Sequence, residues 1–496
     1  MSGFPYLTLM TFVPLAGTIL ILLLPRDRVE TIKRVAALFS LVPLVLAFAV
    51  WAQWDQALPR AYGMVLLEHA EWIPSLGISY TMGTDGLSFP LVFLTALLTF
   101  LAVVASWHMI SHRQKDFFAL LLLLETGMMG VFLALDYVVF YVFWELVLVP
   151  MYFLIGIWGG PRREYAAIKF FIYTLVGSVV MLVGILALYF GTGAETFNMM
   201  EIAAAAESRI PARTQLWIFL ALYLGFAVKV PVFPFHTWLP DAHVEAPTPI
   251  SVVLAAILLK MGTYGFLRIS YPTLPDAAKH FVVMFAALGL VNIIYGALTA
   301  MAQKDLKKLV AYSSISHMGF VLLGLAAGTP LAIAGAMYMN ISHGLISGML
   351  FLMVGAIYDR THTREIPALR GLYVTVPVIA TVLAFTAFAN LGLPGLAGFI
   401  AEFFVLAGTF PVSVTWVAMA VVGMLVVAGF NLWMMQRILM GEPKQEYAGL
   451  PDARPIELFT YVPVVALILV LGVAPGVLMR FLNGPALEIV QRLGGM

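Results

Sequence analysis

Residues Leu222–His243 read LYLGFAVKVPVFPFHTWLPDAH, an apolar helical run interrupted by one cation and two prolines. The cation is Lys229, and Pro231 and Pro234 follow it within five residues. Proline has no backbone N–H and its ring clashes with the preceding turn, so a helix breaks or kinks there. Inside a bilayer, the backbone groups that a break frees must be buried in protein or line a hydrated cavity. A cation beside a broken helix therefore indicates an ion site.

The composition predicts an integral membrane protein. Of the 496 residues, 62% are hydrophobic and only 11% are charged, and mean hydropathy is +0.98, whereas soluble proteins carry roughly 25% charged residues. The alternating segments of a membrane β-barrel are absent from the sequence. A net charge of +1 argues against a nucleic-acid partner, and the lack of cysteine excludes disulfides, iron–sulfur clusters and thiolate metal sites.

The apolar segments predict an all-α polytopic fold with about fourteen transmembrane helices, since one span needs about 20 apolar residues. The predicted spans lie near residues 4–24, 34–54, 86–107, 116–133, 137–158, 166–190, 214–238, 249–270, 280–302, 307–327, 330–358, 373–406, 413–437 and 457–480.

The connections between these spans predict the orientation. Alternate connections hold 17 lysines and arginines on one side but only five on the other. The five are Arg60, Arg209, Arg213, Arg268 and Lys279. The positive-inside rule places the richer side in the cytoplasm, so both termini are expected on the outer side.

Three segments are not predicted to span. Residues 55–85 form an external segment in which 78–82 alternate in polarity between glycines, which is typical of a short hairpin. Residues 192–212 are expected to form a helix at the external surface, and 482–496 an amphipathic tail helix. Ordinary connections remain the alternative for all three.

A second interruption matches the first. The twelfth predicted span is broken by NLGLPGLAG at 390–398, which contains Pro394, and Glu402 follows it. Interrupted helices at corresponding positions of two halves are typical of inverted-repeat transporters. We therefore expect residues 1–115 to hold the first three helices with the external segment, 116–270 and 280–437 to form two inverted five-helix repeats with discontinuous helices 7 and 12, and 438–496 to hold a loop, helix 14 and the tail.

Four charged residues are predicted at membrane depth, where each costs about 2.5–3.5 kcal/mol on insertion scales. They are Glu145, Lys229, Lys260 and Glu402. A structural salt bridge is the alternative for Glu145 and Lys229, and a side chain that reaches the interface is the alternative for Lys260. Long apolar flanks favour a functional role. Two opposite charges 4 Å apart interact by about 4 kcal/mol at an effective dielectric near 20. A lysine therefore holds its proton more tightly when a glutamate is close, so closing a Glu–Lys pair loads a proton and opening the pair releases it.

Histidines extend this set. His317 and His343 fall in adjacent predicted spans among small polar residues, and two together favour a hydrated relay over two satisfied core histidines. His236 and His243 are spaced H-x6-H, which matches no tight zinc pattern, so we predict cavity-lining or capping groups and no metal.

Other buried or boundary charges are interpreted differently. Glu125 is as well explained by structural pairing as by function, whereas Asp136, Arg268 and Asp359 lie near span ends and are predicted to be interfacial.

Several motifs resemble the antiporter-like membrane subunits of respiratory complex I. They are VFWELVLVPMYFLI at 142–155, FHTWLPDAH at 235–243, APTPIS at 246–251 and QKDLKKLVAYSSISH at 303–317. The resemblance covers nearly the whole chain. It implies proton translocation in a bacterial inner membrane, with Glu145 and Lys229 as a pair, Lys260 as the central link, His317 and His343 as the axis, and Glu402 as the terminal group.

The resemblance also implies the setting of the chain. It carries no cofactor itself, because FMN, iron–sulfur clusters and quinone belong to other subunits. Its partners would be other membrane subunits, especially two homologous antiporter-like subunits on either side, together with lipids. A subunit of a multisubunit Na⁺/H⁺ antiporter, of a membrane-bound hydrogenase or of a ferredoxin-driven relative is the alternative. A purely structural scaffold is less consistent with six ionisable groups at membrane depth.

Overall fold

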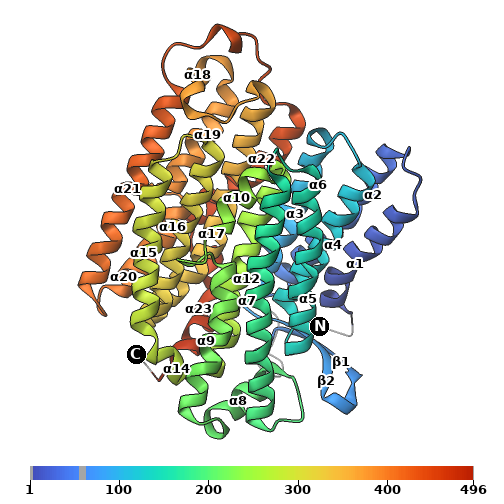
Figure 1. Ribbon diagram of the computed structural model, residues 1–496, viewed down its shortest axis with the longest axis vertical. Helices are drawn as coiled ribbons and strands as arrows, with labels where there is room; N and C mark the ends of the chain where they lie inside the picture. The colour runs from blue at the N-terminus through green and yellow to red at the C-terminus, as the bar shows by residue number, and fades with distance from the viewer. Residues whose placement is uncertain (1–3, 55–62, 495–496) are drawn as a thin grey trace.

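The structure, a computed structural model, describes residues 4–54 and 63–494 and is built almost entirely of helices (Figure 1). Within these residues, twelve helices are long and apolar enough to cross a membrane. Two shorter apolar helices, α19 (Pro377–Asn390) and α20 (Ala397–Thr409), lie on either side of a break. The chain is therefore a multi-pass helical protein, as predicted.

The N-terminal part pairs four helices with one hairpin. The helices are α1 (Tyr6–Leu23), α2 (Val29–Ala52), α3 (Phe89–Met109) and α4 (Gln114–Leu133). Strands β1 (Leu66–Ile73) and β2 (Ile78–Thr84) pair in antiparallel fashion and place Leu66 opposite Thr84. The predicted hairpin is thus confirmed, although 55–62 of the external segment lie outside the described residues. Its turn needs Gly77, whose φ is +68° and which packs directly on the backbone of Glu195.

The middle of the chain contains the first broken helix. Its elements are α5 (Tyr137–Leu146), α6 (Leu148–Trp158), α7 (Arg163–Thr192), α8 (Met199–Arg209), α9 (Ala212–Lys229), α10 (Trp238–Glu245), α11 (Thr248–Val253), η4 (Leu254–Leu258), α12 (Leu259–Gly265), η5 (Phe266–Ser270), α13 (Tyr271–Thr273) and α14 (Pro275–His280). From α11 to α13 the helix is continuous, and η4 and η5 are π-helical turns within it. The helix predicted at 192–212 is confirmed as α8.

The rest of the chain contains the second broken helix. Its elements are α15 (Val282–Met301), α16 (Leu306–Ala327), α17 (Pro330–Thr361), α18 (Leu372–Thr375), α19, α20, α21 (Val414–Leu439), α22 (Pro455–Val473) and α23 (Gly476–Arg492), with 3₁₀ turns at Pro74–Leu76, Ile366–Ala368 and Gln445–Tyr447. The tail helix α23 begins six residues earlier than the predicted 482. Every predicted span contains a helix, but the count of fourteen and the inverted relation of the two halves stay predictions.

Helix α17 lies at the centre of the molecule (Figure 1) and packs against α16, α20, α11, α3 and α23. Along α17, α16 and the α11–α13 helix nearly every side chain is buried. The outward faces of α7 and α21 instead expose large apolar side chains such as Val183 and Leu425. Such faces suit lipid or other membrane proteins, so the polar groups on the central helices are shielded from the bilayer.

Candidate functional site

The first break is held open by side chains that satisfy its freed backbone groups. Helix α9 ends at Lys229, and α10 begins at Trp238 after Pro231 and Pro234. The amide of Asn292, on α15, accepts a hydrogen bond from Phe233 N at 2.8 Å and donates one to the carbonyl of Pro231 at 3.2 Å. The indole of Trp238 donates to the carbonyl of Val228 at 2.9 Å. The predicted break is therefore stabilised by specific hydrogen bonds to its backbone.

Lys229 sits at this break among aromatic rings. Its side chain is 1% exposed, and its Nζ lies 5.3 Å from the ring centroid of Trp144 and 5.6 Å from that of Phe170. Cation–π contacts of this kind stabilise a desolvated ammonium by up to about 2 kcal/mol. In the part of the chain that the structure describes, Nζ has no hydrogen-bond partner.

Glu145 lies close to Lys229 but does not touch it. No nitrogen–oxygen distance of 4 Å or less joins these two described residues, although the carboxylate charge acts on the lysine through space. Glu145 is partly exposed on the side of the molecule, next to the exposed Val142 and Val149. Helix α5 ends one residue later because Pro150 offers no N–H to the carbonyl of Leu146. The predicted Glu145–Lys229 ion pair is thus open in this structure.

Lys260 makes direct contact with one of the predicted histidines. It lies on α12 between the two π-helical turns, is fully buried, and donates from Nζ to the carbonyl of Ala255 at 2.6 Å. The same Nζ lies 2.8 Å from Nδ1 of His343 on α17. Thr263 joins the same two helices through its hydroxyl, which donates to the amide oxygen of Asn340 at 2.8 Å. A π-helical turn is often found at a functional position, as it re-aims side chains.

The second histidine continues the line from His343. The rings of His343 and His317 have centroids 5.6 Å apart. Nε2 of His317 lies 3.6 Å from Oε1 of Glu402 and 3.0 Å from the carbonyl of Asn390. Both histidines and Glu402 are at most 4% exposed. Four of the six predicted site residues are therefore neighbours in an unbroken buried line, in the order Lys260, His343, His317, Glu402.

Glu402 and His317 meet at the second break. Helix α19 ends at Asn390 and α20 begins at Ala397, with Pro394 between them. The backbone turns at Gly392, whose φ is +80°, and the Glu402 carboxylate packs directly on this glycine, so a side chain there would displace it. The amide of Asn390 donates to the hydroxyl of Ser313 at 3.0 Å and to the amide oxygen of Asn431 at 3.2 Å. At the second break the amide of Asn390 thus binds neighbouring side chains, whereas at the first break the amide of Asn292 binds freed backbone groups directly.

The sequence did not predict that Lys307 is buried. This lysine lies on the side whose connections hold most lysines and arginines, which is predicted to be cytoplasmic. Lys307 stands at the start of the predicted span 307–327 and is one of the 17 basic residues of the cytoplasmic connections, but it is 4% exposed and donates to the carbonyl of Ala246 at 2.5 Å. Its charge acts on His243, which is fully buried and stacks on Phe351 with centroids 4.4 Å apart. Neither ring nitrogen of His243 has a hydrogen-bond partner among the described residues. Only tertiary structure brings these residues together, because 64 positions separate them.

His236 has a different environment, as its Nε2 lies 3.3 Å from the hydroxyl of Tyr295. The cavity-lining or capping roles predicted for His236 and His243 stay predictions. Among the described residues, no group of three or more His, Asp or Glu side chains could hold a metal ion.

A buried ion pair between Asp85 and Arg268 lies next to the start of α3, near the hairpin, and the sequence did not predict it. Arg268, predicted to be interfacial, is 8% exposed, and its Nη2 lies 2.6 Å from Oδ1 of Asp85. The guanidinium also donates to the hydroxyl of Tyr264 at 3.1 Å. Burial alone would raise the pKa of Asp85, but the charge and hydrogen bonds of Arg268, with the N–H groups of Leu87 and Ser88, lower it below its ordinary value.

Glu125 lies alone inside the protein. It is fully buried on α4, and neither carboxylate oxygen has a hydrogen-bond partner among the residues that the structure describes. An unpaired charged carboxylate in such a place costs many kcal/mol. The structure thus gives no support to the structural pairing that the sequence left open for Glu125.

Comparison with known proteins identifies two family profiles along the chain. Residues 31–131 match the profile described as NADH-ubiquinone oxidoreductase chain 4, amino terminus. Residues 134–427 match the profile described as NADH:quinone oxidoreductase/Mrp antiporter, TM.

Individual relatives are similar over nearly their full length. NADH-quinone oxidoreductase subunit M of Rhodobacter capsulatus is 42% identical over 98% of this chain and 96% of that protein. F(420)H(2) dehydrogenase subunit M of Methanosarcina mazei is 39% identical over 93% of this chain and 99% of that one. A chain in the structure of respiratory complex I from Thermus thermophilus with bound NADH superposes with a TM-score of 0.89, at 32% identity, over 99% of this chain and 100% of that one.

Proposed function

The chain belongs to the family of NADH–quinone oxidoreductase membrane subunits that includes subunit M and chain 4, and we propose that its buried line of Lys, His and Glu side chains carries the translocated protons. As a member of this family it is a proton-translocating membrane subunit of a respiratory enzyme complex. The predicted resemblance to complex I is confirmed by these relatives.

The contact between Lys260 and His343 is the observation that carries the proposal. Their nitrogens are 2.8 Å apart, a distance at which a proton passes directly between two groups. His343 faces His317, and His317 faces Glu402 across 3.6 Å. No requirement of folding explains four ionisable groups in one buried row, each of which carries an insertion cost.

The other end of the route begins at Glu145 and Lys229. In the open state of this pair, Nζ of Lys229 faces the rings of Trp144 and Phe170 and has no hydrogen-bond partner among the described residues, so its charged form is less stable than in a closed pair. Opening then favours release of the proton toward Lys260. The two lysines lie on packed helices, because Gly262 of α12 sits directly against Lys229, with 3.0 Å between the Cβ of Lys229 and a Cβ placed on that glycine. The route would run Lys229, Lys260, His343, His317, Glu402.

The surroundings of the subunit form part of the same proposal. The electron-transfer groups (FMN, iron–sulfur clusters and quinone) would lie in other subunits, and two homologous antiporter-like subunits with lipid would cover the exposed apolar faces. The subunit would lie in a bacterial inner membrane with both termini on the periplasmic side. The excess of lysine and arginine in one set of connections supports that orientation.

Two substitutions in the assembled complex test the route. Lys229→Ala removes the proton carrier and Glu145→Gln removes the charge that closes the pair. We expect either to lower NADH-driven proton uptake into inverted membrane vesicles at least about tenfold, and to slow coupled NADH oxidation. The matched control is Lys279→Gln, because Lys279 is 40% exposed and pairs with the exposed Asp276.

Full proton pumping with both Lys229→Ala and Glu145→Gln in place would sink the proposed route, whatever the state of the control. Sodium transport is the second candidate, since one matching profile also covers Mrp antiporters. Pumping that continues unchanged in sodium-free medium would exclude a sodium requirement.

A further inference from the structure

His317 is a buried histidine whose two ring nitrogens both face backbone carbonyls. Nδ1 lies 2.8 Å from the carbonyl oxygen of Ser313, one turn earlier on α16, and Nε2 lies 3.0 Å from that of Asn390. A carbonyl oxygen only accepts hydrogen bonds, so each of the two contacts needs an N–H group on the ring. A neutral imidazole has one N–H group, whereas the imidazolium has two. The geometry around His317 therefore fits the charged form of the ring.

Two further features of the second break favour a positive charge at this ring. Asn390 is the last residue of α19, and the carbonyls of a last helical turn lack partners within the helix and carry a partial negative charge. Nε2 of His317 also lies 3.6 Å from Oε1 of Glu402, whose other carboxylate oxygen has no hydrogen-bond partner among the described residues. A helix end and a carboxylate thus meet at the same ring nitrogen.

The Lys260 end of the buried line offers a cation fewer acceptors. Nζ of Lys260 reaches one carbonyl oxygen, that of Ala255 at 2.6 Å, and Nδ1 of His343 at 2.8 Å. Within the described ranges, no carboxylate oxygen lies within 4 Å of this nitrogen. A charge on Lys260 and a charge on His317 repel each other through the protein. One proton shared along the line is therefore more stable at the His317 end.

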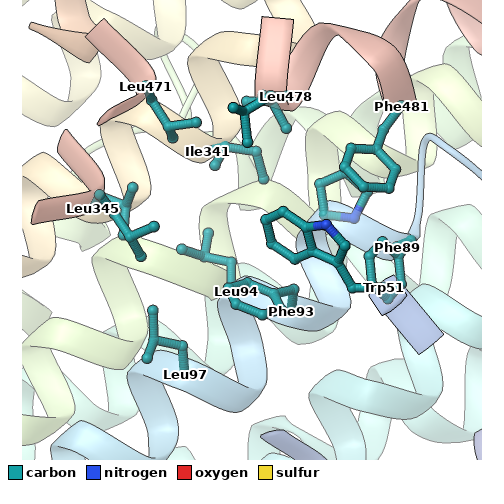
Figure 2. Close-up of a pocket in the computed structure, with 13 residues that line it drawn as sticks. Trp51, Phe89, Phe93, Leu94, Leu97, Ile341, Leu345, Leu471, Leu478 and Phe481 are labelled. Carbon is teal, nitrogen blue, oxygen red and sulfur yellow. The ribbon is translucent and has the colours of Figure 1, made fainter. Parts of the chain in front are cut away.

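The opposite face of α17 gives such a proton no acceptor. Ile341 and Leu345 each lie two positions from His343, which is about 200° around a helix. Both point into an apolar cavity between α2, α3, α17, α22 and α23, as Figure 2 shows. All thirteen residues that line this cavity are apolar or aromatic, and cavities of this kind stay dry. Water therefore does not reach the line of ionisable groups from this side.

We propose that in this conformation the proton on the route rests on His317 as an imidazolium, with the ionised carboxylate of Glu402 as its counter-ion. The assignment agrees with the open pair of Glu145 and Lys229, because a proton released at that end has moved on to the far end. It rests on the proposed function for the identity of the charge as a translocated proton. The imidazolium–carboxylate pair itself is testable without any transport measurement.

Carbodiimide labelling of the assembled complex, without NADH, tests this pair. The probe is N,N′-dicyclohexylcarbodiimide, which enters membranes and adds to a neutral carboxylic acid but not to a carboxylate, and mass spectrometry measures the resulting N-acylurea on each peptide. Glu125 is the reference within the same chain, because it is fully buried and neither of its oxygens has a partner among the described residues. Burial without a partner disfavours the charged form of a carboxyl group. We expect Glu402 to be labelled at least about tenfold less than Glu125.

Three variants separate the charge of His317 from its size. His317→Gln removes the positive charge and leaves Glu402 without a counter-ion, so labelling of Glu402 should rise at least about fivefold. His317→Arg keeps a permanent cation, so Glu402 should stay protected. His243→Gln is the matched control, since His243 is an equally buried histidine that stacks on Phe351 instead, and it should leave Glu402 protected.

Equal labelling of Glu402 and Glu125 in the unmodified complex would overturn the proposal, and this comparison decides alone if His317→Gln prevents assembly. Protection of Glu402 that persists with His317→Gln would overturn it as well, because the carboxylate would then keep its charge without the imidazolium. Full pumping with Lys229→Ala, combined with protection of Glu402 that depends on His317, would remove the proposed route and leave the ion pair. The two failures are thus distinguishable.

Discussion

Lys260 and His343 are in direct contact, 2.8 Å apart, and are consecutive members of the proposed proton route. Because a proton on the proposed route passes through both groups, removing either should stop the same step. We expect Lys260→Met and His343→Leu each to lower NADH-driven proton pumping at least about tenfold, and the double variant to lower it no further. Ser347→Ala is the control, as Ser347 lies one turn from His343 and only donates to that residue's own carbonyl. Effects that multiply in the double variant would show that the two residues act independently.

The pair of Asp85 and Arg268 makes stability depend on pH. Removing one partner of a buried ion pair costs about 3–5 kcal/mol, so Asp85→Asn should lower the thermal denaturation midpoint of the complex at pH 7. The folded-state pKa of Asp85 is below its ordinary value of about 3.9. Stability from this group is therefore fully present above that value and is lost as the pH falls through the folded-state pKa.

The measurement is a pair of denaturation curves for the original and Asp85→Asn complexes between pH 3 and 8. The difference between them should stay constant from pH 8 to about pH 5 and shrink only below pH 4. A difference that shrinks between pH 6 and 8 would assign the effect to another group.

Among residues, the sequence identified the charged groups better than their partners. Lys260, His317, His343 and Glu402 stand out because each interrupts a long apolar or small-residue run. The burial of Arg268 could not be predicted, since its partner Asp85 is 183 positions away. The open state of Glu145 and Lys229 could not be predicted either, because a few ångströms of side-chain position leave no trace in a sequence.

At the scale of elements, the first broken helix depends on an asparagine side chain. Asn292→Leu would leave the N–H of Phe233 and the carbonyl of Pro231 without their partners, at about 1–3 kcal/mol for each buried group. We expect a lower denaturation midpoint and reduced proton pumping, because Lys229 lies at the end of the same break. Thermal denaturation and vesicle proton uptake measure the two effects.

Asn483→Leu provides the matched comparison, since Asn483 is exposed on α23 and the same substitution there removes no buried partner. If Asn292→Leu behaved like Asn483→Leu in both measurements, the break would not need its asparagine.

The sequence predicts where the two helices break. The exact residues at which each helix ends and begins depend on the fold. Pro231, Pro234 and Pro394 each lack a backbone N–H, which made interruptions predictable at these positions. Proline alone does not decide them, since Pro14, Pro43 and Pro463 lie inside the continuous helices α1, α2 and α22. The end of α5 beside Glu145 was not predicted, although Pro150 explains it afterwards. The early start of α23 is also a tertiary effect, because Leu478 and Phe481 pack into the aromatic cluster around Trp51 and Phe89.

At the scale of the whole molecule, opposite ends of the helix bundle differ in charge and in structure. The hairpin and α8 lie at one end of Figure 1, and α18 lies at the other. Most loop lysines and arginines belong to the second end, which is predicted to be cytoplasmic. The sequence therefore predicts which end of the bundle faces the cytoplasm. Helix packing alone does not, since a bundle packs equally well in either orientation.

Because the chain has no cysteine, single introduced cysteines report sidedness without background labelling from this subunit. Ser208→Cys, exposed at the end of α8, should react with a membrane-impermeant maleimide in intact cells, with the outer membrane made permeable where one is present. Gln445→Cys, exposed in the segment between α21 and α22, should react only after the inner membrane is opened. Both variants should keep proton pumping, since neither side chain is near the buried line. Labelling in the reverse order would invert the orientation and place Lys307 and His243 on the periplasmic side, so protons would meet the route from the opposite end.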